Sequence, residues 1–364
     1  MCAETPLLGA DSELRAVIRT ATERQTKLCL RGSGSKDFYG GTGPGLAVDL
    51  SHYRGIIDYA PEELVIVVRA GTPLAEVEAV LSEAGQMLPF EPPQYGGGGT
   101  IGGCIAAGLS GPRRPYAGAS RDYVLGLRLI DGRGQSLQFG GAVIKNVAGY
   151  DVSRLMVGAM GTLGVLRDIA LKVLPRPRVE RTVCFACTEP EAIVRMNRWA
   201  GRMPALSASS HADGVLALRL SGSAAGVNAA LRELGGELLD DAESYWRSLR
   251  DQHNYFFTQA EPLWRVSLPP TAPPLKIPLP LMIEWGGALR WLVGDLDYAA
   301  VQARVRGLGG HITAFRGAPR NIPVFQPLPP ALEQLHTRIR DVFDPHRIFN
   351  PGRFCSQQES DHQR

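Results

Sequence analysis

The chain has 364 residues, 44% hydrophobic and 21% charged, which is the balance of an ordinary globular protein. At this length we expect two or three domains, each with its own core. Its 39 basic and 36 acidic residues give a net charge of +3 without a long run of one sign, which argues against a nucleic-acid-binding protein.

The N-terminal segment, MCAETPLLGADSELR, is acidic and lacks the basic and apolar regions of a secretory signal. No stretch of about 18 apolar residues follows it anywhere, so we expect no transmembrane segment. These two features favour a cytoplasmic location.

Short helices and short strands are predicted as far as residue 175. Leu14, Val17, Ile18 and Ala21 have helical spacing, and apolar runs predict strands at 27–30, 46–50, 55–59 and 64–69. Thr72 and Pro73 are expected to begin a helix that ends at Gly85. A hairpin is predicted from 124–130 and 135–139 around DGRG, and a last strand over 165–174 ends at two prolines, where we place a domain boundary.

The first of two glycine-rich segments is LCLRGSGSKDFYGG, in which a strand leads into Gly32, Ser33, Gly34 and Ser35. Successive small residues allow several backbone amides to point into one concavity, which suits an anion such as pyrophosphate. The segment is neither a Walker A loop nor a G-x-G-x-x-G turn. Taken alone, it fits a tight exposed turn better than an anion site.

The second segment, FEPPQYGGGGTIGGCIAAGLSGPRRPYAG, strengthens the interpretation. Thr100 is expected to cap a short helix whose first amides, those of Ile101, Gly102 and Gly103, face a phosphate. The stretch around Gly108, Ser110 and Gly111, whose side chains are small or absent, could lie under a flat ring. Two such loops suit an extended ligand with a diphosphate.

Residues 176–330 are predicted to form an α+β domain. Strands are expected at 179–187, 215–220, 263–268 and 281–293, and helices at 189–202, 223–234 and 243–257. The proline-rich stretch between Pro262 and Pro280 indicates a long surface loop or flap. A helix over 331–342 and the ending DPHRIFNPGRF follow.

Two arginines are the candidate catalytic residues, Arg265 and Arg290, on neighbouring predicted strands with Glu284, Trp285 and Trp291. Such a face could hold a carboxylate or a flavin anion. The alternative is an aromatic core pair with a salt bridge at the strand ends. The histidines occupy no metal-binding motif, so we expect no metal site.

The order of RGSGS, TIGG, DYVLGLRLIDGRG and GYDVSRLMVGAMGTLGVL resembles the FAD-binding domain of the vanillyl-alcohol oxidase and p-cresol methylhydroxylase family. The resemblance implies an α+β fold: a two-part FAD-binding domain of that type plus a smaller α+β cap domain. We therefore expect the FAD-binding domain at 1–175, the cap at 176–330, and a C-terminal segment returning to the flavin domain at 331–364.

The same resemblance implies the cofactor-binding residues. The first loop and the TIGG turn would hold the pyrophosphate, and Gly161, Gly164 and Val165 would follow the adenine side. Gly118 and Asp122 belong to the expected set, and Asn350 is expected near the ring. Ser35 stands where covalent members carry a histidine, and no cysteine occupies the second attachment position, so FAD is expected to bind non-covalently.

Within the family, RGSGSKDFYGG, LWRVSLP and EWGGALRWLVG are similar to the FAD-binding subunits of bacterial glycolate oxidases. This implies oxidation of glycolate to glyoxylate, with a catalytic flavin subunit and an iron–sulfur subunit as partners, and contact with the inner membrane only through them. The chain itself has no C-x-x-C-x-x-C run for a cluster. It also lacks the histidine-rich metal motif of the family's catalytic 2-hydroxy-acid dehydrogenases, so a non-catalytic assembly subunit stays open. An independent FAD-linked oxidase of another 2-hydroxy acid or alcohol is the remaining alternative.

Overall fold

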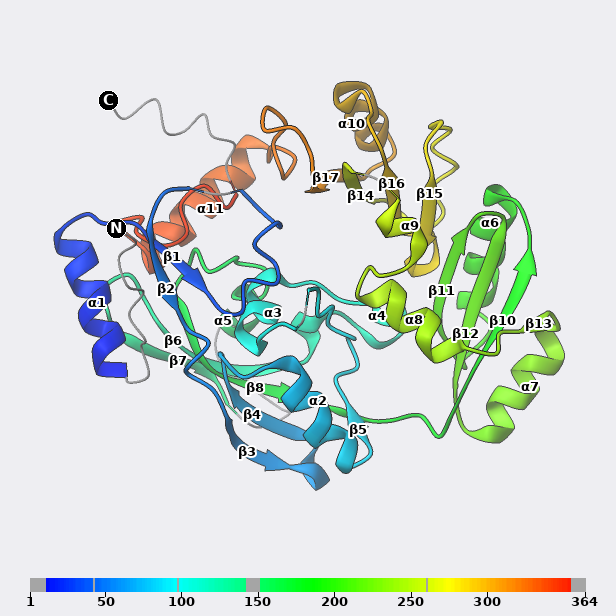
Figure 1. Cartoon of the computed structure of the whole chain (residues 1–364), viewed down its shortest axis with the longest axis horizontal. Coiled ribbons are helices and arrows are strands. Elements are labelled where there is room, and N and C mark those ends of the chain that lie inside the picture. The colour runs from blue at the N-terminus through cyan, green and yellow to red at the C-terminus, as the bar shows by residue number, and fades with distance from the viewer. Residues whose placement is uncertain (1–10, 42, 97, 142–150, 260, 355–364) are drawn as a thin grey trace.

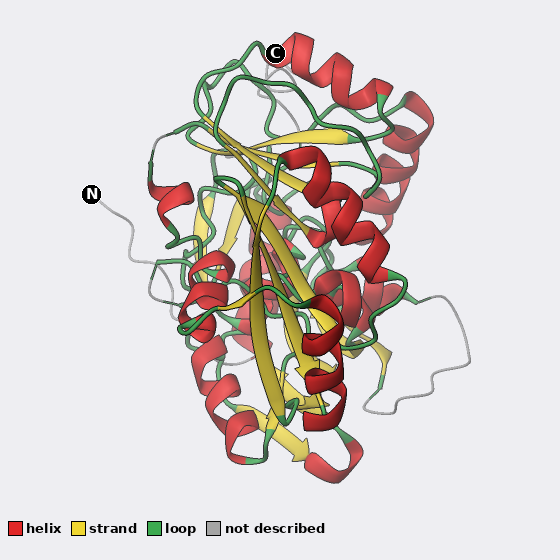
Figure 2. Cartoon of the chain, turned by 90° about the vertical axis from the view of Figure 1, so that its right-hand side faces the viewer, coloured by secondary structure: helices red, strands yellow, loops and turns green. Residues whose placement is uncertain are grey.

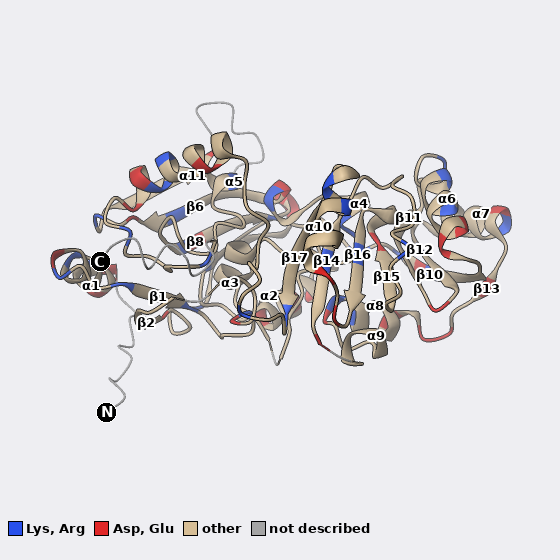
Figure 3. Cartoon of the chain, turned by 90° about the horizontal axis from the view of Figure 1, so that it is seen from above, with Lys and Arg blue, Asp and Glu red and all other residues tan. Residues whose placement is uncertain are grey.

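The computed structural model of the chain describes residues 11–41, 43–96, 98–141, 151–259 and 261–354. It has two lobes side by side, each built on its own sheet (Figure 1). Helices and mostly antiparallel strands are mixed in both lobes, so the predicted α+β class is confirmed. Basic and acidic residues are interspersed along the chain in both lobes (Figure 3).

The first lobe contains a five-stranded antiparallel sheet in the order β3-β4-β8-β6-β7. The strands are β3 (Ile56–Ala60), β4 (Val65–Arg69), β6 (Val124–Ile130), β7 (Ser136–Gly140) and β8 (Val165–Lys172). Helices α2 (Leu74–Glu83) and α3 (Ile101–Ala107) pack against it around one core. A small pair, β5 (Gln86–Met87) and β9 (Leu174–Pro175), extends this lobe, with the short helices α4 (Arg114–Ala117) and α5 (Val152–Leu155).

A separate parallel pair, β1 (Leu28–Arg31) and β2 (Leu46–Asp49), lies beside α1 (Asp11–Glu23). The predicted face of α1 is confirmed, because Leu14, Ile18 and Ala21 are buried. The chain end joins this pair: after α11 (Pro330–Phe343), Phe349 forms a parallel bridge with Leu28. The C-terminal segment therefore returns to the first lobe beside the first glycine-rich loop.

The second lobe is an eight-stranded sheet in the order β13-β10-β12-β11-β15-β16-β14-β17. Its strands are β10 (Val179–Ala186), β11 (Leu206–Ala212), β12 (Val215–Gly222), β13 (Glu237–Leu238), β14 (Leu263–Ser267), β15 (Leu281–Glu284), β16 (Leu289–Val293) and β17 (His311–Arg316). Its helices are α6 (Glu189–Ala200), α7 (Ala224–Leu234), α8 (Ala242–Arg250), α9 (Tyr255–Thr258) and α10 (Tyr298–Gly307). Helices flank the strands on both sides (Figure 2).

One face of this sheet points at the first lobe. Trp291, Leu289 and Phe315 of the sheet share a buried cluster with Tyr39 and Met160 of the first lobe. The opposite face packs on α6 and α7 at one end and on α10 at the other. Side chains on the inner face are therefore the ones available to a site between the lobes.

Three predicted elements differ from the structure. The strand predicted over 281–293 is a hairpin, because Trp285, Gly286 and Gly287 all have positive φ and reverse the chain. The helix predicted over 243–257 breaks into α8 and α9.

Other elements were not predicted. Strands β11 and β17 and helix α10 carry no strong periodic signal in the sequence. Thr72 does not cap α2, since its hydroxyl exchanges hydrogen bonds with Gly55.

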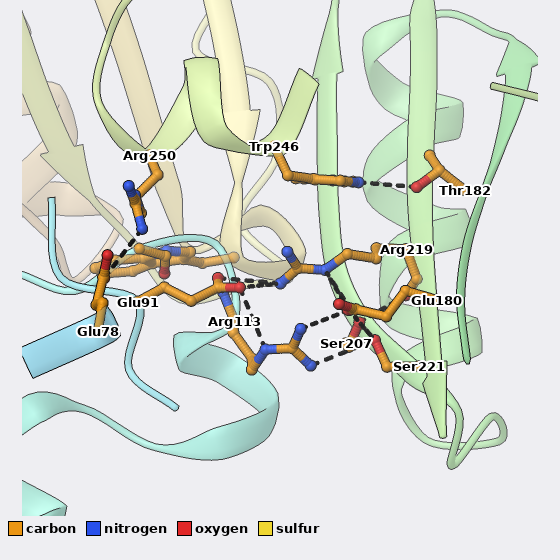
Figure 4. Close-up of polar contacts among 12 residues, drawn as sticks. Glu78, Glu91, Arg113, Glu180, Thr182, Ser207, Arg219, Ser221, Trp246 and Arg250 are labelled. Carbon is orange, nitrogen blue, oxygen red and sulfur yellow. Dashed lines mark hydrogen bonds and ion pairs between the residues drawn. The ribbon is translucent and has the colours of Figure 1, made fainter. Parts of the chain in front are cut away.

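The lobes meet at a group of four charged side chains (Figure 4). Glu91 and Arg113 come from the first lobe, Glu180 and Arg219 from the second. Glu91 accepts from Arg113 Nε at 3.3 Å, and its Oε1 lies 2.8 Å from Arg219 Nη2. Arg113 Nη2 lies 2.6 Å from Glu180 Oε1. These residues also line a cavity of about 970 Å³ at the junction.

No helix within the described ranges is both long enough and apolar enough to span a bilayer.

Candidate functional site

A cavity of about 110 Å³ lies in the first lobe, where the loop after β1, helix α3 and the returning C-terminal segment meet. Ten of the predicted cofactor-binding residues line it: Gly32, Ser33, Gly34, Ser35, Thr100, Gly102, Gly103, Gly161, Gly164 and Asn350. They come from four separate parts of the chain. The cavity has room for only part of a dinucleotide, so any such ligand would extend beyond it.

The loop after β1 offers backbone donors to this cavity. Within the described residues, the amides of Ser33 and Gly34 donate to no acceptor. Gly34 has a φ of 78°, a conformation that favours glycine and turns successive amides toward one side. The Ser33 hydroxyl is engaged, because it donates to the Gly98 carbonyl at 3.0 Å. The backbone of this loop therefore leaves two amides available to a ligand.

The charges around the cavity favour an anion. Three cationic side chains, Arg31, Lys36 and Arg353, and one carboxylate, Asp37, line it, a net charge of +2. Arg31 and Asp37 neutralise each other in a half-exposed ion pair of 2.5 Å. Lys36 and Arg353 therefore supply the uncompensated positive charge. A dianionic diphosphate matches this charge.

Lys36 is mostly buried, and burial lowers the pKa of its ammonium. Its Nζ lies 3.5 Å from Ser35 Oγ and 5.6 Å from the centre of the Tyr95 ring. Burial likewise lowers the pKa of Arg353, which donates to the Tyr39 carbonyl at 2.9 Å. Neither cation was singled out from the sequence, although a lysine inside a glycine–serine loop was a usable signal.

The first turn of α3 differs from its predicted role. Thr100 caps the helix as expected, because its hydroxyl accepts from the Gly103 amide at 3.2 Å. The Ile101 amide, however, donates to the Thr72 carbonyl at 2.9 Å, and the Gly102 amide to the Ala70 carbonyl at 2.7 Å. These amides are engaged within the chain and do not face a phosphate. A Cβ at Gly102 would lie 2.7 Å from that of Ala70, so close packing explains this glycine.

Asn350 is likewise engaged by the protein at both ends of its side-chain amide. Its Oδ1 accepts from the Leu30 amide at 2.6 Å, and its Nδ2 donates to the Met160 carbonyl at 2.7 Å. A Cβ at Gly161 would come within 2.5 Å of this amide nitrogen. Asn350 thus fastens the C-terminal segment to β1 and to the turn before β8, which closes one wall of the cavity.

The other predicted cofactor-binding residues lie outside the cavity lining: Ile101, Gly108, Ser110, Gly111, Gly118, Asp122 and Val165. Ile101 and Val165 are buried in core clusters. Gly108 and Gly118 end helices with positive φ. The Ser110 hydroxyl and the Asp122 carboxylate accept backbone amides nearby, and the Gly111 carbonyl accepts from the Trp285 indole.

The two candidate arginines have different surroundings. Arg290 is completely buried and donates to the carbonyls of Ala272, Pro273 and Gly287, so it fastens the proline-rich loop inside the protein. Arg265 is partly exposed, pairs with Trp291 and Thr313 in strand register, and lies over the Trp285 ring. Only Arg265 fits the predicted ligand-holding role.

Among the described residues, no three histidine, cysteine, aspartate or glutamate side chains gather as they would around a metal ion.

Comparison with known proteins agrees with this geometry. The family described as "FAD binding domain" matches residues 9–140. The solved structure of alkyldihydroxyacetonephosphate synthase shares the fold, with a TM-score of 0.67 over 94% of this chain and 76% of that one, at 13% identity. Glycolate oxidase subunit GlcD of Bacillus subtilis strain 168 is 32% identical over 174 residues, 47% of this chain and 37% of GlcD.

A further relative matches almost from end to end. Glycolate oxidase subunit GlcE of Escherichia coli K12 is 44% identical over 340 residues, 93% of this chain and 96% of GlcE. The similarity therefore covers both lobes as well as the glycine-rich loops. With that identity over that length, the chain belongs to the GlcE family of FAD-binding oxidoreductase subunits.

Proposed function

We propose that this protein is the FAD-binding subunit of a complex that oxidises glycolate to glyoxylate and passes the electrons to partner subunits. The observation that carries the proposal is the cavity with free loop amides and a net charge of +2 in a chain so similar to GlcE. In this proposal residues 1–175 and 331–364 form the FAD-binding unit, and residues 176–330 form the cap.

The residues that line the cavity would contribute to cofactor binding in two different ways. The amides of Ser33 and Gly34, with Lys36 and Arg353, would bind the diphosphate, because they are the donors and cations that the chain leaves available. Gly32, Ser35, Gly161 and Gly164 give the close backbone approach. Bound FAD would supply the two-electron chemistry, and the protein orients it and excludes water. The predicted residues outside the cavity would act by packing.

Non-covalent attachment is the part of this proposal that a simple experiment tests. Ser35, which lines the cavity, offers no nitrogen nucleophile to the flavin. We expect the purified protein to be yellow, and acid precipitation to release FAD quantitatively into the supernatant. The absorbance of supernatant and pellet measures this directly. Flavin that stays with the pellet would contradict non-covalent binding, and a colourless protein that takes up no added FAD would contradict the cofactor.

The partners follow from the relatives, since GlcE and GlcD are by name subunits of glycolate oxidase. We propose a catalytic flavin subunit and an iron–sulfur subunit as partners of this chain, which would be cytoplasmic and reach the inner membrane through them. The alternatives remain an assembly subunit without catalysis and an independent oxidase of another 2-hydroxy acid or alcohol.

Anaerobic stopped-flow reduction separates these readings. We expect glycolate to leave the flavin of the isolated chain oxidised over seconds, and to reduce it once both partner subunits are added. The reason is that oxidation needs a group to take the hydroxyl proton, and the chain lacks the motif that supplies one in catalytic relatives. Rapid, saturable reduction of the isolated chain would establish an independent oxidase. No reduction in the assembled complex would establish an assembly role.

A further inference from the structure

The turn between β15 and β16 presents a fixed aromatic platform. Trp285 has a φ of 54°, an uncommon conformation for a side chain of this size. It persists because several bonds hold the turn: the Trp285 indole donates to the Gly111 carbonyl at 3.0 Å, and the Gly286 amide donates to Ser209 Oγ at 3.1 Å. Strained backbone that the surroundings hold in place is frequent at ligand sites.

Two arginines from different lobes lie over this indole. The Arg114 guanidinium carbon is 4.4 Å from the ring centre, and that of Arg265 is 5.1 Å from it. Within the part of the chain that the structure describes, neither side chain donates a hydrogen bond or forms an ion pair. Other arginines near the junction are engaged, as Arg113, Arg219 and Arg316 show.

The pair is electrostatically unfavourable as it stands. Burial lowers the pKa of Arg114, and the nearby charge of Arg265 lowers it further. Asp122 acts in the opposite direction but lies beyond ion-pair distance. Glu284 likewise acts on Arg265 from beyond ion-pair distance. Two partly desolvated cations on one platform, with no carboxylate paired to either of them among the described residues, form a site of positive potential. A bound anion would relieve this repulsion and find several planar N–H donors.

The position of the pair connects it with the proposed cofactor site. Arg265 lies on the inner face of the second lobe and is electrostatically coupled to Tyr39, which lines the cavity in the first lobe. Arg114 follows the bare loop at Gly111. Trp285 belongs to the same buried cluster as Tyr39, so the platform lies where the two lobes face each other.

We propose that Arg114 and Arg265, both held over Trp285, bind the carboxylate of a small organic acid between the lobes. Guanidinium groups match a carboxylate in shape and charge, and the indole keeps both oriented before the ligand arrives. The identification of the acid as a 2-hydroxy acid rests on the proposed function. The existence of the site does not, because both arginines and the platform belong to this chain.

Isothermal titration with oxalate tests the site, since oxalate carries carboxylates but has no C–H bond to oxidise. We expect the FAD-loaded protein to bind one oxalate, and Arg114→Gln and Arg265→Gln each to weaken binding by at least tenfold. Arg265→Lys should retain part of the affinity. Arg198→Gln, an exposed position on α6, is the matched control and should bind like the parent. FAD content and thermal midpoint, measured for every variant, should be unchanged.

The outcomes separate this site from the cofactor site. Absence of oxalate binding to FAD-loaded parent protein would overturn the proposal, as would unchanged affinity in Arg265→Gln. Phosphate that binds as tightly as oxalate would overturn the assignment to a carboxylate. If the protein holds no FAD, the proposed function fails, and the same titration of FAD-free protein still decides whether the arginine pair binds oxalate.

Discussion

Replacing Glu91 with alanine is expected to lower the free energy of unfolding by about 3–5 kcal/mol, the usual loss when one partner of a buried ion pair is removed. Glu91 joins the lobes through Arg219 and also pairs with Arg113 of its own lobe; the two arginine side chains are each only 7% exposed. Burial alone raises the pKa of Glu91, but Arg219 and Arg113 outweigh it and hold the pKa below its usual range. The carboxylate is therefore ionised, and its removal leaves two buried arginines with only the half-exposed Glu180 as their counterion.

Chemical denaturation followed by tryptophan fluorescence measures this loss. Glu83→Ala is the matched control, because Glu83 is an exposed glutamate on α2, and we expect it to change the unfolding free energy by less than about 0.5 kcal/mol. Glu91→Gln should fall between the two, since it keeps an acceptor for the Arg113 amide but loses the charge. A Glu91→Ala protein as stable as the control would show that the four-charge group contributes nothing to the junction.

Glu284→Gln is expected to stabilise the protein in a pH-dependent way. Glu284 is 4% exposed, and burial raises its pKa to about 7, opposed by the hydrogen bond from Trp291 Nε1 at 2.8 Å and by Arg265. A carboxyl whose pKa is higher in the folded chain than in the unfolded chain destabilises the fold when it ionises. The native protein should therefore lose stability as the pH rises from about 4.5 to about 7, by roughly 3 kcal/mol in all.

The glutamine keeps an acceptor for the indole and has no charge to bury. The variant should be close to the native protein in stability at pH 4.5, and more stable by up to about 3 kcal/mol at pH 8. Thermal unfolding at the two pH values measures the difference, with the exposed Glu233→Gln on α7 as the control. A stability difference that is the same at both pH values would refute the assigned pKa.

Local sequence patterns determined most of the first lobe. The hairpin of β6 and β7 follows from alternating apolar residues around DGRG, and the buried face of α1 follows from helical spacing. Strand β11, LSASSHA, was missed because its small and polar residues are buried by elements far away in the sequence: Ser210 bonds to Tyr245 of α8, and Ser209 accepts from the Gly286 amide. Its burial is a property of the assembled sheet.

The sequence by itself also indicated the loop proposed to bind the cofactor, since Gly34 has a positive φ and a Cβ at Gly32 would clash with Thr100 Oγ1. Tertiary structure decided the rest of the site. The amides after Thr100 are engaged by Ala70 and Thr72, about thirty residues away, a pairing that no local pattern reveals. Strand register and the turn at Trp285 left Arg290 engaged by backbone carbonyls, while Arg265 faces the junction. Arg114 lies over Trp285, some 170 residues further along the chain. A turn or a helix face can be predicted from neighbouring residues, but the contact between two lobes depends on residues far apart in sequence.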